Sequence, residues 1–360
     1  MTLIIYYDYD TISNSSSTRA WNATTNSPLS PAITSHSPNF LIWLILVLSA
    51  NLFGAITNLL IAIATLTYRP IRCCSSSGLI AHCASLDVIR SIIVYPGLSL
   101  IAFLGPYHHF PQSACRYVGG LAYILVYTTN WAYCCLGVHR LCAVALPHHF
   151  RYLTQKSAVA AINLFPWLLS ALLALFPFFG IGVEFVYTQP WNGCVIGPLG
   201  DRDAGFVLAM GTFLQSAISL IAHAAILMQV RMSARNRRRR VTTVKEEEDL
   251  RNQYDQQMIT LNSEATQRRY DISRMLFVCS VWTFVVSLML PLVISWAPAY
   301  LATNYPAQTW LRFLQFLSSA FNPVFFLLVS SLYRAGEKPS SRATLPMEDE
   351  RKFHPLAASS

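Results

Sequence analysis

Long apolar segments recur along this 360-residue chain and constrain its fold more than any other feature. A run of about 20 apolar residues crosses the hydrocarbon core of a bilayer as a helix, because each residue adds about 1.5 Å. Seven segments meet this length, so the sequence predicts an all-α membrane protein, a seven-transmembrane helix bundle. The approximate spans are Phe40–Leu66, Leu79–Phe103, Ala114–Ala145, Val159–Phe179, Gly205–Val230, Ile272–Trp296 and Trp310–Leu332.

Composition agrees with a membrane protein. The chain is 54% hydrophobic and only 12% charged, whereas a soluble domain carries about 25% charged residues. Its net charge of +9 follows the loops on one side of the bilayer, which disfavours nucleic-acid binding. The nine cysteines show no paired metal-ligand spacing, and we expect no cofactor.

The distribution of basic residues predicts the orientation in the membrane. The loops after the first, third and fifth segments carry nearly all the loop lysines and arginines, including the run Arg237 to Arg240. The positive-inside rule therefore places these loops and the C-terminus in the cytosol, and the N-terminus outside. The sequons at Asn14 and Asn22 agree with an outer N-terminus, because glycosylation occurs in the lumen.

Domain organisation follows from the same pattern. Residues 1–38 form a predicted extracellular, glycosylated tail, and residues 39–335 the seven-helix domain. Residues 231–271 form a long third cytoplasmic loop, for which we expect helical extensions around a mobile middle. Residues 336–360 form a polar cytoplasmic tail.

Particular residues occupy the helices in a recognisable order. These are Asn58 in the first, Asp87 and Pro96 in the second, Cys115 and Arg140 in the third, Trp167 in the fourth, Cys194 in the loop before the fifth, Pro291 in the sixth and Asn322-Pro323-Val324-Phe325-Phe326 in the seventh. With this set over about residues 40–335, the chain resembles the rhodopsin-like (class A) G-protein-coupled receptors. The resemblance implies a plasma-membrane receptor and not an enzyme. Its partners would be an extracellular ligand, heterotrimeric G proteins and arrestin.

The resemblance implies a disulfide between Cys115 and Cys194. Such a bond would tie the loop before the fifth helix over the outer ends of the helices and shape the mouth of a cavity. The alternative is two unrelated free thiols.

A buried carboxylate in hydrocarbon needs partners, so Asp87 predicts a central polar cluster. In the family such a cluster can hold a sodium ion and rearranges on activation. Arg90 lies three residues after Asp87, where a helical charge pair forms. We expect Arg90 to replace a sodium ion at Asp87 at least in part; otherwise it faces the ligand cavity. The other candidate members are Asn58, Thr129, Ser318, Ser319 and Asn322.

By resemblance, His139 and Arg140 form the G-protein switch at the inner end of the third helix. Asp271, at the inner start of the sixth helix, is the expected partner of Arg140 in a resting state. Breaking this pair would let the sixth helix swing outward and admit a G-protein helix. Pro291 and Pro323 are the expected kinks, because proline removes a backbone donor and clashes one turn back.

Several positions depart from the family pattern and indicate a divergent, orphan-type member. The usual acid before the arginine is His139, and the usual tyrosine after it is Leu141. Met289 replaces the aromatic residue two before Pro291, and Phe326 replaces a tyrosine. The fifth segment lacks the usual proline, and His223 stands near an expected tyrosine. Raised basal activity and weakened coupling both remain open.

The ligand class is constrained by exclusion. Ala122 stands where amine receptors carry an aspartate, and Phe316 where visual pigments carry the retinal-linked lysine. An aromatic, apolar cavity favours a lipid-like or peptide ligand. Arg90, Arg116 and Arg312 would favour an anionic head group, or they are rim and structural charges. The expected cavity residues are Tyr123, Val126, Tyr127, Met289, Arg312 and Phe316.

Two other functions compete with a coupling receptor. A decoy or scaffold of the same fold would bind ligand without activating a G protein, which the altered His139-Arg140-Leu141 sequence makes plausible. A seven-span transporter would show internal repeats or helices broken at the midplane, and the sequence shows neither.

Overall fold

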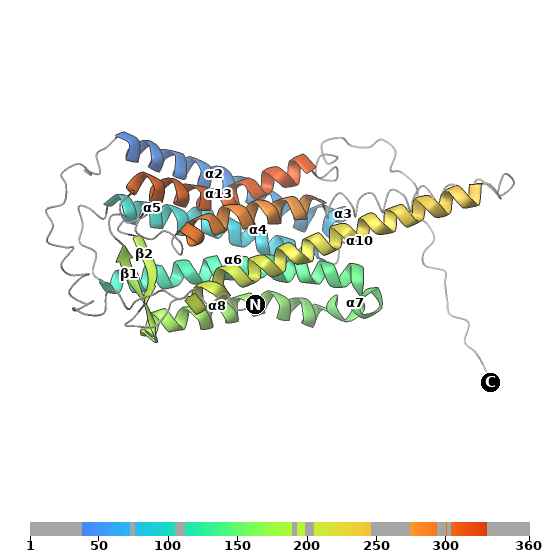
Figure 1. Ribbon diagram of the computed structural model, residues 1–360, viewed down its shortest axis with the longest axis horizontal. Helices are drawn as coiled ribbons and strands as arrows, with labels where there is room; N and C mark the ends of the chain where they lie inside the picture. The colour runs from blue at the N-terminus through green and yellow to red at the C-terminus, as the bar shows by residue number, and fades with distance from the viewer. Residues whose placement is uncertain are drawn as a thin grey trace.

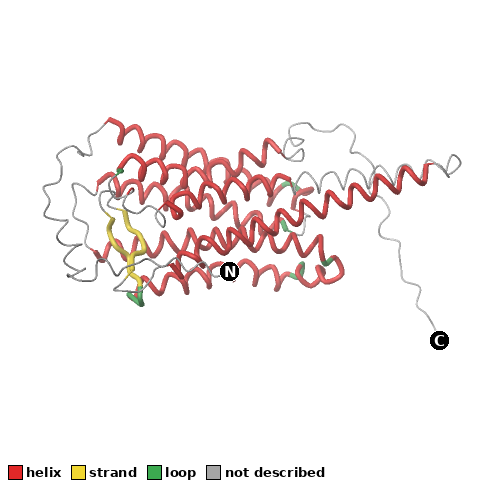
Figure 2. Tube along the Cα trace, in the orientation of Figure 1, coloured by secondary structure: helices red, strands yellow, loops and turns green. Residues whose placement is uncertain are grey.

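The computed structural model describes residues 38–72, 76–104, 112–188, 193–198, 205–245, 274–293, 300 and 304–329. Its long helices lie side by side along one axis (Figures 1 and 2). A two-stranded hairpin lies across one end of the bundle, and the short helix α7 lies at the other. We refer to these as the hairpin end and the α7 end.

Seven helical rods make up the bundle. In chain order they are α2 (Pro38–Thr67); α4 (Ser77–Ile89), η3 (Arg90–Val94) and α5 (Tyr95–Leu104); α6 (Gln112–Ala145); α8 (Lys156–Phe179); α9 (Gly205–Leu208), η4 (Ala209–Phe213) and α10 (Leu214–Lys245); the helix 274–293; and α13 (Tyr305–Val329). The short helices α3 (Arg69–Arg72) and α7 (Pro147–Leu153) lie in two of the connections.

Within the described ranges, six helices are long and apolar enough to cross a membrane. The seventh rod, α13, has 25 residues, about 37 Å at the usual rise, but carries more polar side chains. It packs along α2, where Trp43 Nε1 donates to the carbonyl of Thr309 at 3.0 Å. The predicted seven-helix bundle is confirmed.

Large apolar side chains are exposed on the outer surface of the helix bundle. Leu52, Leu60 and Ile221 are each at least 60% exposed, as expected for helices that face lipid. Inside, buried side chains form clusters under the hairpin, between α2, α5 and α13, and between α4, α6 and the sixth helix.

The fifth rod is longer than the predicted segment. The helix continues past Val230 to Lys245, because arginine and lysine end an apolar run but are good helix formers. In Figure 1 the last part of α10 projects beyond the α7 end of the other helices.

Two rods contain a turn of π-helix. In the second rod, the Tyr95 N–H bonds the carbonyl of Arg90, five residues back. Pro96 follows at once, and a proline ring cannot donate and clashes with the carbonyl four residues earlier, which explains the wider turn. The π-turn Ala209–Phe213 of the fifth rod forms without any proline.

The hairpin pairs β1 (Val183–Thr188) with β2 (Gly193–Pro198) in antiparallel register, from Val183 opposite Pro198 to Thr188 opposite Gly193. It follows α8, whose C-cap residue Gly180 has the left-handed conformation (φ 68°) that glycine adopts without strain. Phe185 points into the bundle against Gly119 of α6, where a Cβ would lie 2.8 Å from its ring.

Candidate functional site

A disulfide joins Cys115 at the start of α6 to Cys194 in β2, with the two Cα atoms 5.4 Å apart. Both residues are buried. This confirms the predicted disulfide and shows what it holds in place. The bond fastens the hairpin across the helix ends, so that Phe185 of the hairpin packs directly on Tyr123 of α6.

Asp87 lies in the centre of the bundle with none of its surface exposed. Its Oδ1 pairs with Arg90 Nη1 at 3.4 Å. Its Oδ2 accepts hydrogen bonds from the Tyr133 hydroxyl at 2.5 Å and from Asn322 Nδ2 at 3.5 Å. Asn322 Nδ2 also lies 3.3 Å from the Tyr133 hydroxyl oxygen. This network connects the second, third and seventh rods.

Tyr133 was missed by the sequence reasoning. It lies four residues after Thr129 and therefore on the same face of α6, which is the signal that could have identified it. Thr129 itself is buried, but its hydroxyl donates to the Leu125 carbonyl of its own helix at 2.8 Å. Tyrosine reaches the carboxylate because its hydroxyl lies farther from the backbone.

The remaining predicted cluster members tie the first rod to the seventh. Asn58 Nδ2 donates to the carbonyls of Gly54 at 2.9 Å and Ser319 at 3.0 Å. The Ser319 hydroxyl lies 3.4 Å from the Phe316 carbonyl, and Ser318 is buried beside it. Asn58 and Ser319 therefore use backbone carbonyls as partners.

The Arg90 guanidinium lies between the carboxylate and an aromatic ring. It is 5% exposed, and its central carbon is 4.9 Å from the centre of the Tyr95 ring. Tyr95 in turn contacts Phe316, with ring centres 4.5 Å apart. A packed sequence of side chains therefore runs from Phe316 through Tyr95 and Arg90 to Asp87.

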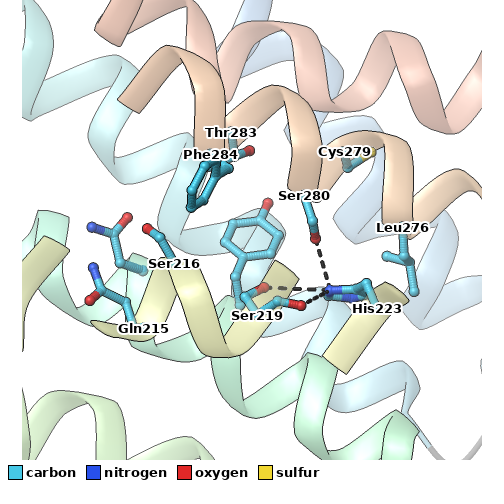
Figure 3. A pocket seen from close by; sticks show the side chains of 11 residues that line it. Gln215, Ser216, Ser219, His223, Leu276, Cys279, Ser280, Thr283 and Phe284 are labelled. Carbon is cyan, nitrogen blue, oxygen red and sulfur yellow. Dashed lines mark hydrogen bonds between the residues drawn. The ribbon is translucent and has the colours of Figure 1, made fainter. Parts of the chain in front are cut away.

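A second buried polar site lies between α6, α10 and the sixth helix (Figure 3). It encloses a cavity of about 30 Å³, with room for about two water molecules. His223 Nδ1 lies 2.8 Å from both the Ser219 carbonyl oxygen and the Ser280 hydroxyl. The lining residues are Asn130, Tyr133, Gln215, Ser216, Ser219, His223, Leu276, Cys279, Ser280, Thr283 and Phe284.

Hydrogen-bond chemistry assigns the histidine tautomer in this cavity. Because a carbonyl oxygen only accepts, the bond to Ser219 requires a hydrogen on Nδ1, which leaves a lone pair on Nε2. Among the described residues, neither His223 Nε2 nor Gln215 Oε1 has a protein partner. Gly137 of α6 makes room for the ring, since a Cβ there would lie 2.9 Å from it.

The π-turn of the fifth rod supports the same region. The Gly211 carbonyl accepts hydrogen bonds from Gln215 Nε2 and, at 3.4 Å, from Asn130 Nδ2 of α6. A side chain at Gly211 would overlap the ring of Tyr127. Glycine is therefore required there to let the fifth rod approach α6.

The expected cavity residues lie toward the hairpin end and divide into two packed groups. Tyr123 contacts Tyr127 and Phe185, with ring centres 5.4 and 5.6 Å apart. Phe316 packs with Tyr95, and Val126 contacts both groups. Arg312 lies on α13, partly exposed.

Met289, which was also expected to line the ligand cavity, is not buried. It is 43% exposed, while Leu288 and Leu290 on either side are buried. Each step along a helix turns the side chain by about 100°. Met289 therefore faces outward at this level, while the residue on either side of it is turned back into the bundle.

At the α7 end, His139 is buried and packs edge-on against Phe150 of α7, with ring centres 5.0 Å apart. Arg140 follows it, partly buried, and Pro323 lies inside α13. Asp271, Asn14 and Asn22 lie outside the described residues, and Phe326 is described by its backbone alone.

Seven membrane-length rods, a hairpin fastened over one end and a charge pair at the centre define an integral membrane helical bundle. The family model described as "7 transmembrane receptor (rhodopsin family)" matches residues 57–326, well over half of the chain. The chain therefore belongs to the rhodopsin-like, class A family of G-protein-coupled receptors. It has no significant match among curated proteins. Membership makes it a multi-pass receptor of the plasma membrane, whose partners in general are an extracellular ligand and a G protein.

Proposed function

We propose that this receptor binds a lipid-like or peptide ligand at the hairpin end and activates heterotrimeric G proteins at the α7 end. The observation that carries the proposal is the network of Asp87, Tyr133 and Asn322, because it joins three rods between the two ends. A fixed centre of this kind lets the rods move about it, so that a ligand at one end can bias the arrangement of the helices at the other end.

The proposed orientation has the N-terminus outside the cell, glycosylated at Asn14 and Asn22. In support, the exposed arginines Arg69, Arg151 and Arg235 belong to α3, α7 and α10, which lie toward the α7 end (Figure 1). The positive-inside rule assigns that end to the cytosol. The hairpin then faces the extracellular medium.

The proposed ligand class rests on the hairpin end. Tyr123, Tyr127 and Phe185 form a packed aromatic cluster beneath the disulfide-linked hairpin, in which Tyr127 and Phe185 are buried. A ligand that opened this cluster would meet mainly apolar side chains, which favours a ligand with a large apolar portion. Ala122 and Phe316 stand where an amine receptor or a visual pigment would need charged side chains.

In the proposed switch, Arg140 pairs with Asp271 at rest and is released when the sixth helix moves outward. This movement would break hydrogen bonds made by the described part of the sixth helix. Ser280 bonds His223 of α10, Thr283 lies 3.4 Å from Asn322 Oδ1 of α13, and Cys279 Sγ lies 3.9 Å from the Asn322 carbonyl oxygen. Single neutral hydrogen bonds contribute only about 0.5–1.5 kcal/mol each, so a ligand can offset their loss. Arrestin would use the same opened end.

A G-protein dissociation reporter in cells, screened against a lipid and peptide library, tests the proposal. We expect a signal that Arg140→Ala abolishes at equal surface expression. Arg151→Ala is the matched control, because it removes an exposed arginine from α7 at the same end. No difference between wild type and Arg140→Ala, with any ligand, would contradict coupling.

That negative result would favour a non-coupling decoy of the same fold. The specific observation in its favour is His139, which replaces the usual acid beside Arg140 and packs against Phe150. A decoy would still bind ligand at the surface, so direct binding of a library compound without a reporter signal identifies it.

A further inference from the structure

In this receptor family a sodium ion can bind at the central carboxylate. The side chains around Asp87 do not fit such an ion. A sodium ion needs lone pairs from several oxygen atoms. Asp87 Oδ1 faces Arg90 Nη1, while Oδ2 receives the Tyr133 hydroxyl and Asn322 Nδ2. Both carboxylate oxygens are therefore already engaged by protein donors.

Charge balance gives a second reason. Asp87 carries one negative charge, and Arg90 carries a guanidinium, which stays protonated in proteins. The pair is neutral, and both members are almost fully buried. A sodium ion added to this site would leave an uncompensated positive charge in the membrane interior, which is strongly unfavourable.

The packing around Arg90 keeps the guanidinium in place. Its face lies over the Tyr95 ring, an arrangement that attracts a cation. Tyr95 is itself buried against Phe316. Arg90 also begins the π-turn that Pro96 imposes, so its backbone is fixed by local structure.

We propose that Arg90 is a built-in cation that takes the place of an exchangeable sodium ion at Asp87. The receptor's stability is then independent of sodium, and removal of the guanidinium uncovers a cation site on the carboxylate. This inference does not depend on ligand binding or G-protein coupling, because it concerns the folded protein alone.

The test is thermal unfolding of the full-length receptor purified in detergent. Unfolding is followed with a fluorophore that reacts with thiols, because Cys83, Cys134 and Cys279 are buried free cysteines. Sodium chloride replaces N-methylglucamine chloride at constant ionic strength. We expect the same midpoint temperature for the wild type in both salts.

The Arg90→Met variant should unfold at a lower temperature in N-methylglucamine chloride and recover in a saturable manner as sodium increases, as linkage requires for a bound ligand. Adding Asp87→Asn should abolish that recovery, which locates the ion at the carboxylate. Arg90→Lys is the matched control, because it keeps a cation and should remain insensitive to sodium.

A saturable sodium effect on the wild type would overturn the proposal, because it would show an ion bound despite Arg90. A flat response of Arg90→Met would overturn it too, since no cation site would then lie beneath the arginine. Should Arg90→Met fail to fold, Arg90→Gln replaces it and keeps one donor toward Asp87. If neither variant folds, the wild-type titration alone decides the question.

Discussion

The two buried polar sites of this receptor differ in whether they contain an ion pair and in whether a cavity lies between their groups. At the Asp87 site a full negative charge meets Arg90, and Tyr133 and Asn322 use its other oxygen. At the His223 site the groups are neutral, and a cavity of about 30 Å³ remains between them. Tyr133 belongs to both sites, since its hydroxyl bonds Asp87 while its side chain lines the cavity.

This difference indicates which contacts hold the bundle together and which allow movement. A buried charge that loses its partner is left uncompensated, so the Asp87 site resists change. A neutral group beside a cavity that is large enough for water can exchange a protein partner for water at little cost. We therefore interpret the Asp87 site as the fixed point of the bundle and the His223 site as the place where the sixth helix separates from α10.

The largest effect on stability should follow removal of the Arg90 cation from the Asp87 site. Arg90→Met leaves the charge of Asp87 buried without its counter-ion, and in sodium-free buffer we expect a loss of about 3–5 kcal/mol in the free energy of unfolding. Arg312→Met is the comparison variant, because Arg312 is only partly buried. The measurement is chemical unfolding in detergent. Equal losses in the two variants would remove the distinction on which the comparison rests.

Tyr133→Phe should have the next largest effect. It deletes the hydroxyl that bonds Asp87 but keeps the ring, so it removes one charge-assisted hydrogen bond worth about 1.5–3 kcal/mol. Tyr123→Phe makes the same chemical change at the hairpin end, away from Asp87, and should cost less. The same unfolding assay compares them, and a smaller loss for Tyr133→Phe would show that Asp87 is held by other groups.

Gly54→Ala probes the packing beside the fixed site. A Cβ at Gly54 would lie 2.8 Å from the Ala320 Cα of α13, and backbone atoms cannot move aside cheaply. We expect a loss of about 1–3 kcal/mol from overpacking. Gly97→Ala is the matched control, because nothing lies within 4 Å of its added Cβ; it should be neutral or slightly stabilising. Equal thermal midpoints for the two variants would contradict close packing here.

The smallest effect on stability is expected at the His223 site. Ser280→Ala removes the hydroxyl that bonds His223 Nδ1, but the Ser219 carbonyl and water can still satisfy the ring. The loss should be about 0.5–1.5 kcal/mol, accompanied by a higher basal G-protein signal. Ser287→Ala, a buried serine of the same helix, should leave the basal signal unchanged. A rise in both variants would point to general loosening of the helix.

Sequence patterns predicted the architecture well, because membrane helices depend on the length and polarity of single segments. The disulfide was found through resemblance. The position of Arg90 beside Asp87 follows from a local spacing of three residues. These features need no knowledge of how one helix is rotated against another.

Features that depend on helix rotation and local backbone geometry were not predictable in the same way. Tyr133 of the third rod bonds Asp87 of the second rod, and the His223 cavity forms only where three helices come together. The π-turn at Gly211 is not followed by a proline that would have predicted it from the sequence. Met289 was expected inside by its position before Pro291, yet the neighbouring leucines are the buried ones.

The most direct test of the fixed site is a double-mutant cycle of Asp87→Asn and Arg90→Met, measured by chemical unfolding of the full-length receptor. Each single variant leaves one charged or polar group without its partner, while the double variant removes both charges together. We predict that the double variant is more stable than the sum of the single losses implies, with a coupling energy of about 1.5–3 kcal/mol. Additivity within about 0.5 kcal/mol would contradict the account, because it would mean that the two side chains do not depend on each other.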